Sequence, residues 1–215
     1  MKFDTVIFDL DGTILDTLAD LRDSVNFALE KNGLPCRSTD EIRAFVGNGI
    51  RLLIERAVPL NTEKEVVDKC FADFKEHYKN NSANLTKPYD GVVDVLYRLK
   101  SKGVKLSVVS NKADFAVQTL VKKYFDGVFD FAVGEKEGVR RKPFPDSVLT
   151  AMHCLGAHKD TTVYVGDSEV DVETASNSAI PCVAVTWGFR DKQVLECLKP
   201  EYIIDNPEEI IKIIE

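Results

Sequence analysis

Three short apolar runs of the sequence end in side chains that could bind a cation or transfer a phosphoryl group. These side chains are Asp9 and Asp11, then Ser110 and Asn111, and finally Asp167 with Asp171 four residues later. Carboxylates that lie close together need a cation, and oxygen ligands favour a hard ion such as Mg²⁺. An aspartate can also attack phosphorus and form an acyl phosphate. The pattern therefore indicates metal-assisted phosphoryl chemistry.

The apolar runs themselves read as buried strands of a parallel sheet. Thr5–Phe8, Lys105–Val109 and Thr162–Val165 are short and β-branched, and helical patterns separate them along much of the chain. Alternating strands and helices predict an α/β fold, a Rossmann-like sheet with helices on both faces. In such sheets the active site lies beyond the carboxyl ends of the strands. We therefore expect the polar residues after these runs to meet at one edge.

A helical block interrupts the α/β pattern early in the chain. Apolar residues recur at helical spacing between about residues 16 and 83, and no strand-like run lies among them. Two capping boxes are predicted within it, Ser38 with Glu41 and Thr62 with Glu65. We expect a core of residues 1–15 and 84–215 and an inserted helical domain of residues 16–83.

The composition of the chain disfavours several classes of binding partner and of cellular location. The chain has 215 residues and a formal net charge of −7, without a long Lys/Arg run, which disfavours nucleic acid. The sequence contains neither a signal-peptide pattern nor an apolar run long enough to span a membrane. The five cysteines are widely spaced and form no CxxC pair, as expected for free thiols in a reducing compartment. These features predict a cytoplasmic protein.

Four motifs, in this order along the chain, resemble those of the haloacid dehalogenase superfamily. Within that superfamily the chain is most similar to the phosphoglycolate phosphatase group. The motifs are Asp9-Leu10-Asp11-Gly12-Thr13, Ser110 with Asn111, Lys142-Pro143, and Gly166-Asp167-Ser168 with Asp171. Any one of them alone would be weak, but their order and spacing agree over essentially the whole chain. The resemblance implies an Mg²⁺-dependent phosphatase with an aspartyl-phosphate intermediate and a helical cap domain.

The resemblance also implies a role for each motif residue. Asp9 would be the nucleophile and a metal ligand, and Asp11 the general acid/base with its carbonyl on the metal. Lys142 would balance the charge between Asp9 and phosphate. The remaining roles are phosphoryl binding by Ser110 and Asn111, metal binding by Asp167, support of the metal by Asp171, and orientation of the first loop by Thr13.

Two cap residues are further candidates. In the resembled group the cap loop at Gly47-Asn48-Gly49 faces the active site, so Asn48 and Arg51 are expected to contact the substrate. That substrate would be a small phosphorylated metabolite, with phosphoglycolate as the leading candidate. The sequence predicts neither a nucleic-acid partner nor a membrane partner, and it leaves both a monomer and a homodimer open.

Other functions remain as alternatives. A sugar phosphomutase of the same superfamily usually carries a histidine twelve residues after the nucleophile, where this chain has Leu21. Dehalogenases lack the carboxylate at the Asp11 position, and phosphonate hydrolases have another residue there. The presence of Asp11 therefore disfavours both activities. An inorganic pyrophosphatase stays possible. From another class, a receiver-type switch would store phosphate on an aspartate, but it needs no acid/base group such as Asp11.

Overall fold

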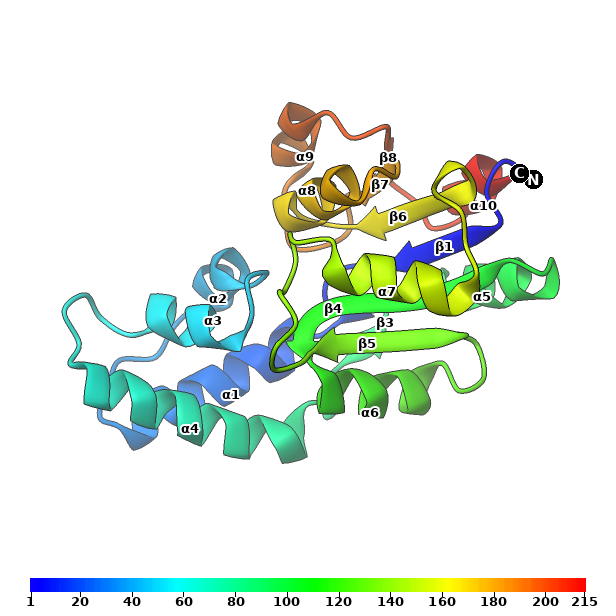
Figure 1. Ribbon diagram of the computed structural model, residues 1–215. Coiled ribbons are helices and arrows are strands. Elements are labelled where there is room, and N and C mark those ends of the chain that lie inside the picture. Colours follow the sequence, from blue (N-terminus) through cyan, green and yellow to red (C-terminus); the bar gives the residue numbers. More distant parts are fainter. The chain divides into compact units, whose positions relative to one another are not determined.

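A six-stranded parallel sheet forms the centre of one of two compact units in the computed structural model, which describes residues 1–215. The strand order is β5-β4-β1-β6-β7-β8 (Figure 1). The strands are β1 (Thr5–Phe8), β4 (Lys105–Ala113), β5 (Phe131–Glu135), β6 (Thr162–Gly166), β7 (Cys182–Val185) and β8 (Tyr202–Ile204). The predicted α/β class with a parallel sheet is confirmed.

Strand β1 lies at the centre of this sheet and is buried along its whole length. Its side chains alternate between two apolar layers. Ile7 packs among residues of helices α7 (Asp146–Leu155) and α8 (Glu169–Ser178). Phe8 faces the opposite layer, beside helices α5 (Val92–Ser101) and α10 (Glu209–Ile214). Helices on both faces explain why β1 reads as an unbroken apolar run.

Two further helices complete this unit. Helix α6 (Asp114–Tyr124) connects β4 to β5 and packs on both strands. Helix α9 (Lys192–Leu198) lies between β7 and β8 in the chain, and a short 3₁₀ turn (Lys159–Thr161) precedes β6.

The second compact unit, Asp16–Lys87, is helical. It contains α1 (Leu18–Lys31), α2 (Thr39–Phe45), α3 (Ile50–Ala57) and α4 (Lys64–Asn81), of which α1 and α4 pack most extensively on each other. The chain crosses between the units at β2 (Leu15–Asp16) and β3 (Lys87–Pro88), which pair as a two-stranded sheet. The assignment of this unit as a cap remains a prediction.

One buried carboxylate explains why residues 84–87 belong to the helical unit. Asp20 on α1 is 2% exposed and accepts hydrogen bonds from the backbone N–H of Leu85 and of Thr86, at 2.9 and 2.8 Å. The Thr86 hydroxyl donates to it as well, at 2.7 Å. These bonds tie the segment after α4 to the first helix, a contact that the sequence pattern does not reveal.

The two predicted capping boxes have different outcomes. Ser38 and Glu41 form one at the start of α2, with both reciprocal bonds present. The box predicted at Thr62 and Glu65 is wrong. The Thr62 hydroxyl donates instead to the Pro59 carbonyl at 2.7 Å, and α4 begins at Lys64 without a side-chain cap. A local turn thus competes for the same hydroxyl.

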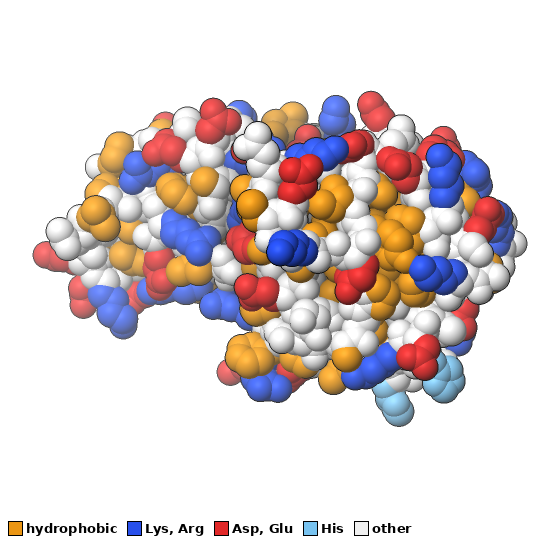
Figure 2. Space-filling view, turned by 90° about the horizontal axis from the view of Figure 1, so that it is seen from above, with side chains coloured by type: hydrophobic (Ala, Val, Ile, Leu, Met, Phe, Trp, Pro, Cys, Tyr) orange, Lys and Arg blue, Asp and Glu red, His pale blue; other side chains and the backbone are white.

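Acidic and basic side chains are interspersed on the face shown in Figure 2. No helix of the structure combines the length and the apolar character needed to cross a membrane.

Candidate active site

The three strands that carry the predicted site residues are neighbours in the sheet. Strand β1 pairs with β4 on one side and with β6 on the other, in parallel register (Figure 1). The carboxyl ends of all three therefore meet at one edge of the sheet. Strand β4 extends to Ala113, beyond the predicted end at Val109, with a register shift between these residues. Ser110 and Asn111 thus lie on an irregular end of β4 rather than in a loop after it.

Lys142 is buried between two carboxylates of this edge. Its Nζ lies 2.8 Å from Asp9 Oδ1 and 2.8 Å from Asp171 Oδ1, and it donates to the Tyr164 hydroxyl at 3.0 Å. Burial by itself would lower the pKa of Lys142, but the charges of Asp171 and Asp9 hold that pKa well above its ordinary value. The lysine is therefore a permanent positive charge beside Asp9.

Asp9 is held in an unfavourable environment for a carboxylate. Burial raises its pKa from 3.8 to about 7, against the attraction of Lys142 and with the repulsion of Asp171. Its Oδ1 is buried and receives no hydrogen bond of ordinary geometry; its contact is the ion pair with Lys142. Such a perturbed carboxylate at a strand end is typical of a functional group.

Asp167 shares this environment. Burial raises its pKa well above the usual range, and the charges of Asp171 and Asp9 add to the rise. Two donors orient its oxygens: the Thr13 hydroxyl at 3.1 Å and the Phe189 backbone N–H at 2.7 Å. Gly12 lies so close that a Cβ there would stand 2.3 Å from Asp167 Oδ2. The first loop therefore packs directly against this carboxylate.

Three of these carboxylates could hold a cation. Asp9, Asp167 and Asp171 each offer an oxygen within 4.8 Å of the others, and all three are buried. Lys142 is the cation that touches this group, so the carboxylates exceed the positive charge in contact with them. A divalent ion with oxygen ligands fits both the donor set and the excess negative charge.

The raised pKa values predict how the metal-free protein responds to pH. Between the ordinary pKa of 3.8 and the folded value of about 7, Asp9 binds more protons in the folded state than in the unfolded state. Stability should therefore fall as pH rises from about 5 to 8, and Asp167 acts in the same direction.

Thermal unfolding in EDTA over that pH range measures this effect. We expect the melting temperature to decrease with pH, to recover on addition of Mg²⁺, and to show a smaller slope in Asp9→Asn. We expect a decrease from pH 5 to pH 8. An equally steep increase of the melting temperature in EDTA over this range would contradict the assigned environment.

Asp171 has both oxygens engaged by the protein. Its Oδ2 accepts from the backbone N–H groups of Asp167 and Ser168 at 3.1 and 3.0 Å and from the Ser168 hydroxyl at 2.6 Å. Its Oδ1 receives Lys142 and the Tyr164 hydroxyl. Asp171 thus closes a capping box at the start of α8 and positions both Asp167 and Lys142.

Asn111 holds the loop that carries Lys142. Its Oδ1 accepts from the Lys142 backbone N–H at 2.8 Å, and its Nδ2 donates to the Lys142 carbonyl at 3.0 Å. Ser110 is 6% exposed, and its Oγ accepts from the Lys112 N–H at 3.2 Å. The structure brings both residues to the sheet edge that carries the carboxylate cluster, and Asn111 is engaged in positioning Lys142.

The partly buried Asp11 and the buried Lys112 form a second ion pair at the same edge. Lys112 Nζ lies 2.8 Å from Asp11 Oδ1 and 3.1 Å from Oδ2. The lysine side chain is 2% exposed and the aspartate 15%. The two aspartates of the first motif therefore pair with different lysines, Asp9 with Lys142 and Asp11 with Lys112.

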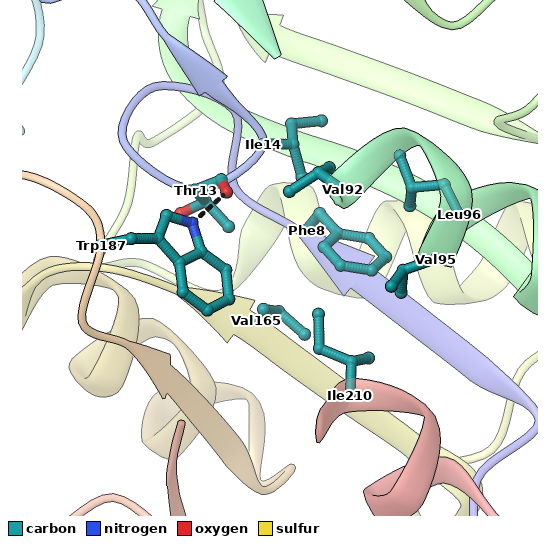
Figure 3. Close-up of a pocket in the computed structure, with 9 residues that line it drawn as sticks. All are labelled: Phe8, Thr13, Ile14, Val92, Val95, Leu96, Val165, Trp187 and Ile210. Carbon is teal, nitrogen blue, oxygen red and sulfur yellow. Dashed lines mark hydrogen bonds between the residues drawn. The ribbon is translucent and has the colours of Figure 1, made fainter. Parts of the chain in front are cut away.

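The loop after β7 fixes the first motif from the other side. The Trp187 indole N–H donates to the Thr13 carbonyl at 3.0 Å, over a narrow apolar pocket lined by β1, β6, α5 and α10 (Figure 3). Gly188 has no room for a side chain, because a Cβ would lie 2.4 Å from the Gly12 carbonyl oxygen. This loop therefore holds Thr13 and Gly12 in place.

Asn48 and Arg51 belong to the helical unit Asp16–Lys87. Asn48 belongs to the turn between α2 and α3, and Arg51 lies in the first turn of α3. The Arg51 guanidinium pairs with Glu55 at 2.6 Å and with Asp68 at 2.5 Å. Their predicted contact with substrate stays a prediction.

Comparison with known proteins supports one family. A family profile described as haloacid dehalogenase-like hydrolase matches residues 6–185. The chain belongs to the haloacid dehalogenase-like hydrolases. A phosphoglycolate phosphatase of Aquifex aeolicus is 31% identical over 215 residues, covering 98% of this chain and 96% of the relative. One from Agrobacterium fabrum is 33% identical over 209 residues, covering 93% and 87%.

Solved structures of haloacid dehalogenase-like proteins agree with this assignment. A crystal structure from Lactobacillus delbrueckii subsp. bulgaricus, provisionally described as a phosphoglycolate phosphatase, is similar at a TM-score of 0.94 and 38% identity. It covers 100% of this chain and 99% of its own. The predicted family and the predicted enzyme class, a phosphoric monoester hydrolase, are confirmed.

Two features of the site have no role that the sequence pattern alone predicts. Lys112 follows Ser110 and Asn111 directly, but the motif assigns it no function. Its position at the end of a buried strand is the sequence feature that could have indicated a role in the site. The loop Trp187-Gly188-Phe189 was not singled out. Its glycine and tryptophan directly after a predicted strand were the available hint.

Proposed function

We propose that this protein is an Mg²⁺-dependent phosphatase that hydrolyses a small phosphate monoester through a phosphoryl group on Asp9. One observation carries the proposal: Asp9 is buried against Lys142, within a cluster of three carboxylates that a single cation would satisfy. The chemistry of the donor set and the excess negative charge support magnesium.

The side chains would divide the metal site between them. Asp9 and Asp167 are the carboxylates proposed to hold the ion, with the backbone carbonyl of Asp11. Asp171 has both oxygens engaged by protein donors, which favours a positioning role for it. When bound, Mg²⁺ would neutralise negative charge on the phosphoryl oxygens and on Asp9.

The proposed reaction has two steps. In the first, an Asp9 oxygen attacks phosphorus, the bond from phosphorus to the ester oxygen breaks, and Asp11 gives a proton to the leaving oxygen. In the second, a water attacks the phosphorus of phospho-Asp9 and loses a proton to Asp11. The bond between phosphorus and Asp9 then breaks, which releases phosphate. Lys142 and Ser110 would stabilise the phosphoryl oxygens.

The names of the relatives support a substrate class. Several relatives named phosphoglycolate phosphatase are about a third identical along nearly the whole chain. We therefore propose a small phosphorylated carboxylate such as 2-phosphoglycolate. Asn48 and Arg51 of the helical unit are the proposed substrate contacts outside the core.

Phosphate release from a panel of compounds tests this proposal. The panel contains 2-phosphoglycolate, glucose 1-phosphate, pyrophosphate and an aryl phosphate, each with Mg²⁺ and with EDTA. We expect release that depends on Mg²⁺, with 2-phosphoglycolate preferred. Release that is equal in EDTA would contradict the metal role, and no release from any compound would contradict the phosphatase.

Pyrophosphate hydrolysis is a second candidate because one relative points to it. A protein of Caldanaerobacter subterraneus, provisionally named pyrophosphatase PpaX, is 33% identical over 217 residues and covers 100% of this chain and 96% of the relative. Preference for pyrophosphate in the same panel would favour this reading. A sugar phosphomutase is disfavoured, because Leu21 is a buried apolar residue of α1 where such mutases carry histidine.

A further inference from the structure

Lys112 is a buried lysine whose side chain restricts the Asp11 carboxylate. Its ammonium contacts both oxygens of Asp11, at 2.8 and 3.1 Å, and its side chain is 2% exposed. A buried lysine held on one carboxylate restricts that carboxylate much more than a solvent-exposed pair would. Asp11 is therefore fixed in orientation.

The backbone around Lys112 is fixed as well. Strand β5 passes so close that a Cβ at Gly134 would lie 2.4 Å from the Lys112 carbonyl oxygen. The Gly134 N–H donates to Asp114 Oδ1 at 2.9 Å, which ties β5 to the residues just after Lys112. The ammonium thus projects towards Asp11 from a backbone segment that is packed closely against β5.

The Asp11 carboxylate lies outside the group of carboxylates that could hold a metal ion. Asp11 is two residues from Asp9, yet the group of carboxylates with oxygens within 4.8 Å of one another consists of Asp9, Asp167 and Asp171. A loose carboxylate beside a divalent cation tends to become a ligand. A carboxylate bound to a metal is a poor proton donor and acceptor for an ester oxygen or a water.

We infer that Lys112 is a positioning residue that holds the Asp11 carboxylate off the metal cluster and aims it at the leaving oxygen. This inference rests on the proposed function, in which Asp11 moves the protons. It gives the two buried lysines different tasks. Lys142 balances the charge of Asp9, and Lys112 keeps the side-chain carboxylate of Asp11, though not its backbone carbonyl, out of the metal's coordination sphere.

The variant Lys112→Met tests the inference, because methionine keeps much of the apolar length and removes the ammonium. Mg²⁺ binding is measured by calorimetry and by the fluorescence of Trp187, the single tryptophan of the chain, whose indole is bonded to Thr13. We expect Mg²⁺ to bind at least as tightly as to wild type, since a positive charge is lost and a carboxylate is released.

Kinetics provide the second measurement. In Lys112→Met we expect kcat to fall on the order of 10²-fold, the scale of lost acid–base catalysis, with KM changed by less than about threefold. A merely structural lysine would weaken Mg²⁺ binding and raise KM together. That pattern, or an unchanged kcat, would overturn the inference.

A double-mutant cycle with Asp11→Asn separates positioning from a direct role. If Lys112 acts through Asp11, adding Lys112→Met to Asp11→Asn should lower kcat little further, and an additive loss would overturn the inference. The variant Lys122→Met, at an exposed position of α6, serves as the control for loss of a lysine.

Failure of the proposed function would look different from failure of this inference. A wild-type protein without Mg²⁺-dependent hydrolysis contradicts the function. The Mg²⁺ affinities of wild type and Lys112→Met can be compared even then, and weaker binding by the variant would still overturn the positioning role.

Discussion

Replacing Asp9 by asparagine is expected to abolish turnover, with a loss on the order of 10⁴-fold or more. Asparagine is nearly the same size but is not a nucleophile towards phosphorus, so the proposed covalent step has no donor. Steady-state phosphate release from 2-phosphoglycolate measures the loss. Residual activity above roughly 1% of wild type would contradict the role of Asp9.

The same substitution should stabilise the metal-free protein at pH 8. Burial raises the pKa of Asp9 to about 7, so its ionised form is disfavoured in the folded state. Removing that charge should raise the melting temperature in EDTA, by about 2–4 °C for each kcal/mol gained. Lys142 keeps its contact with Asp171 at 2.8 Å, so the lysine is not left unpaired. A variant that is both inactive and less stable would indicate misfolding instead.

Replacing Lys142 by methionine should damage both activity and stability. The ammonium lies 2.8 Å from Asp9 and from Asp171, and its removal leaves two buried carboxylates without their cation. Loss of one partner of a buried ion pair costs about 3–5 kcal/mol. The lost electrostatic stabilisation of the transferring phosphoryl group should lower kcat by about 10²–10³-fold.

The pH dependence of that stability loss makes the prediction for Lys142 specific. Burial raises the pKa of Asp9 to about 7, so this carboxyl is protonated at low pH and the destabilisation in EDTA should be smaller at pH 5 than at pH 8. Lys122→Met, at an exposed position, should change neither stability nor activity appreciably. Equal losses for the two lysine variants, or a loss in Lys142→Met independent of pH, would contradict the assigned contacts.

The parts of the site that follow from local sequence could be predicted. Thr5–Phe8 and Thr162–Gly166 are unbroken apolar runs, and each is followed at once by a carboxylate. A parallel sheet brings such strand ends to one edge, so the sequence predicts that Asp9 and Asp167 lie close together. Their packing in one buried cluster agrees with that reasoning.

Other contacts depend on tertiary structure and could not be predicted. Asp11 and Lys112 are 101 residues apart, and Trp187 reaches Thr13 across 174 residues. No periodicity links such positions, and their pairing is visible only once the sheet is assembled. The capping box expected at Thr62 failed for a local reason, since its hydroxyl is used by the preceding turn.

The most direct test of the account is to look for a phosphoryl group on Asp9 during turnover. Wild-type protein is mixed with excess 2-phosphoglycolate and Mg²⁺, and the reaction is quenched rapidly in acid. The protein is then digested, and the mass of the peptide that contains Asp9 is measured by mass spectrometry. Asp11→Asn is treated in the same way at longer times, because its slower second step should preserve the intermediate.

We expect the mass of one phosphoryl group on Asp9, absent in EDTA and absent in Asp9→Asn. Release of phosphate by the wild type, with no phosphoryl group on Asp9 in either protein at any quench time, would contradict the central claim.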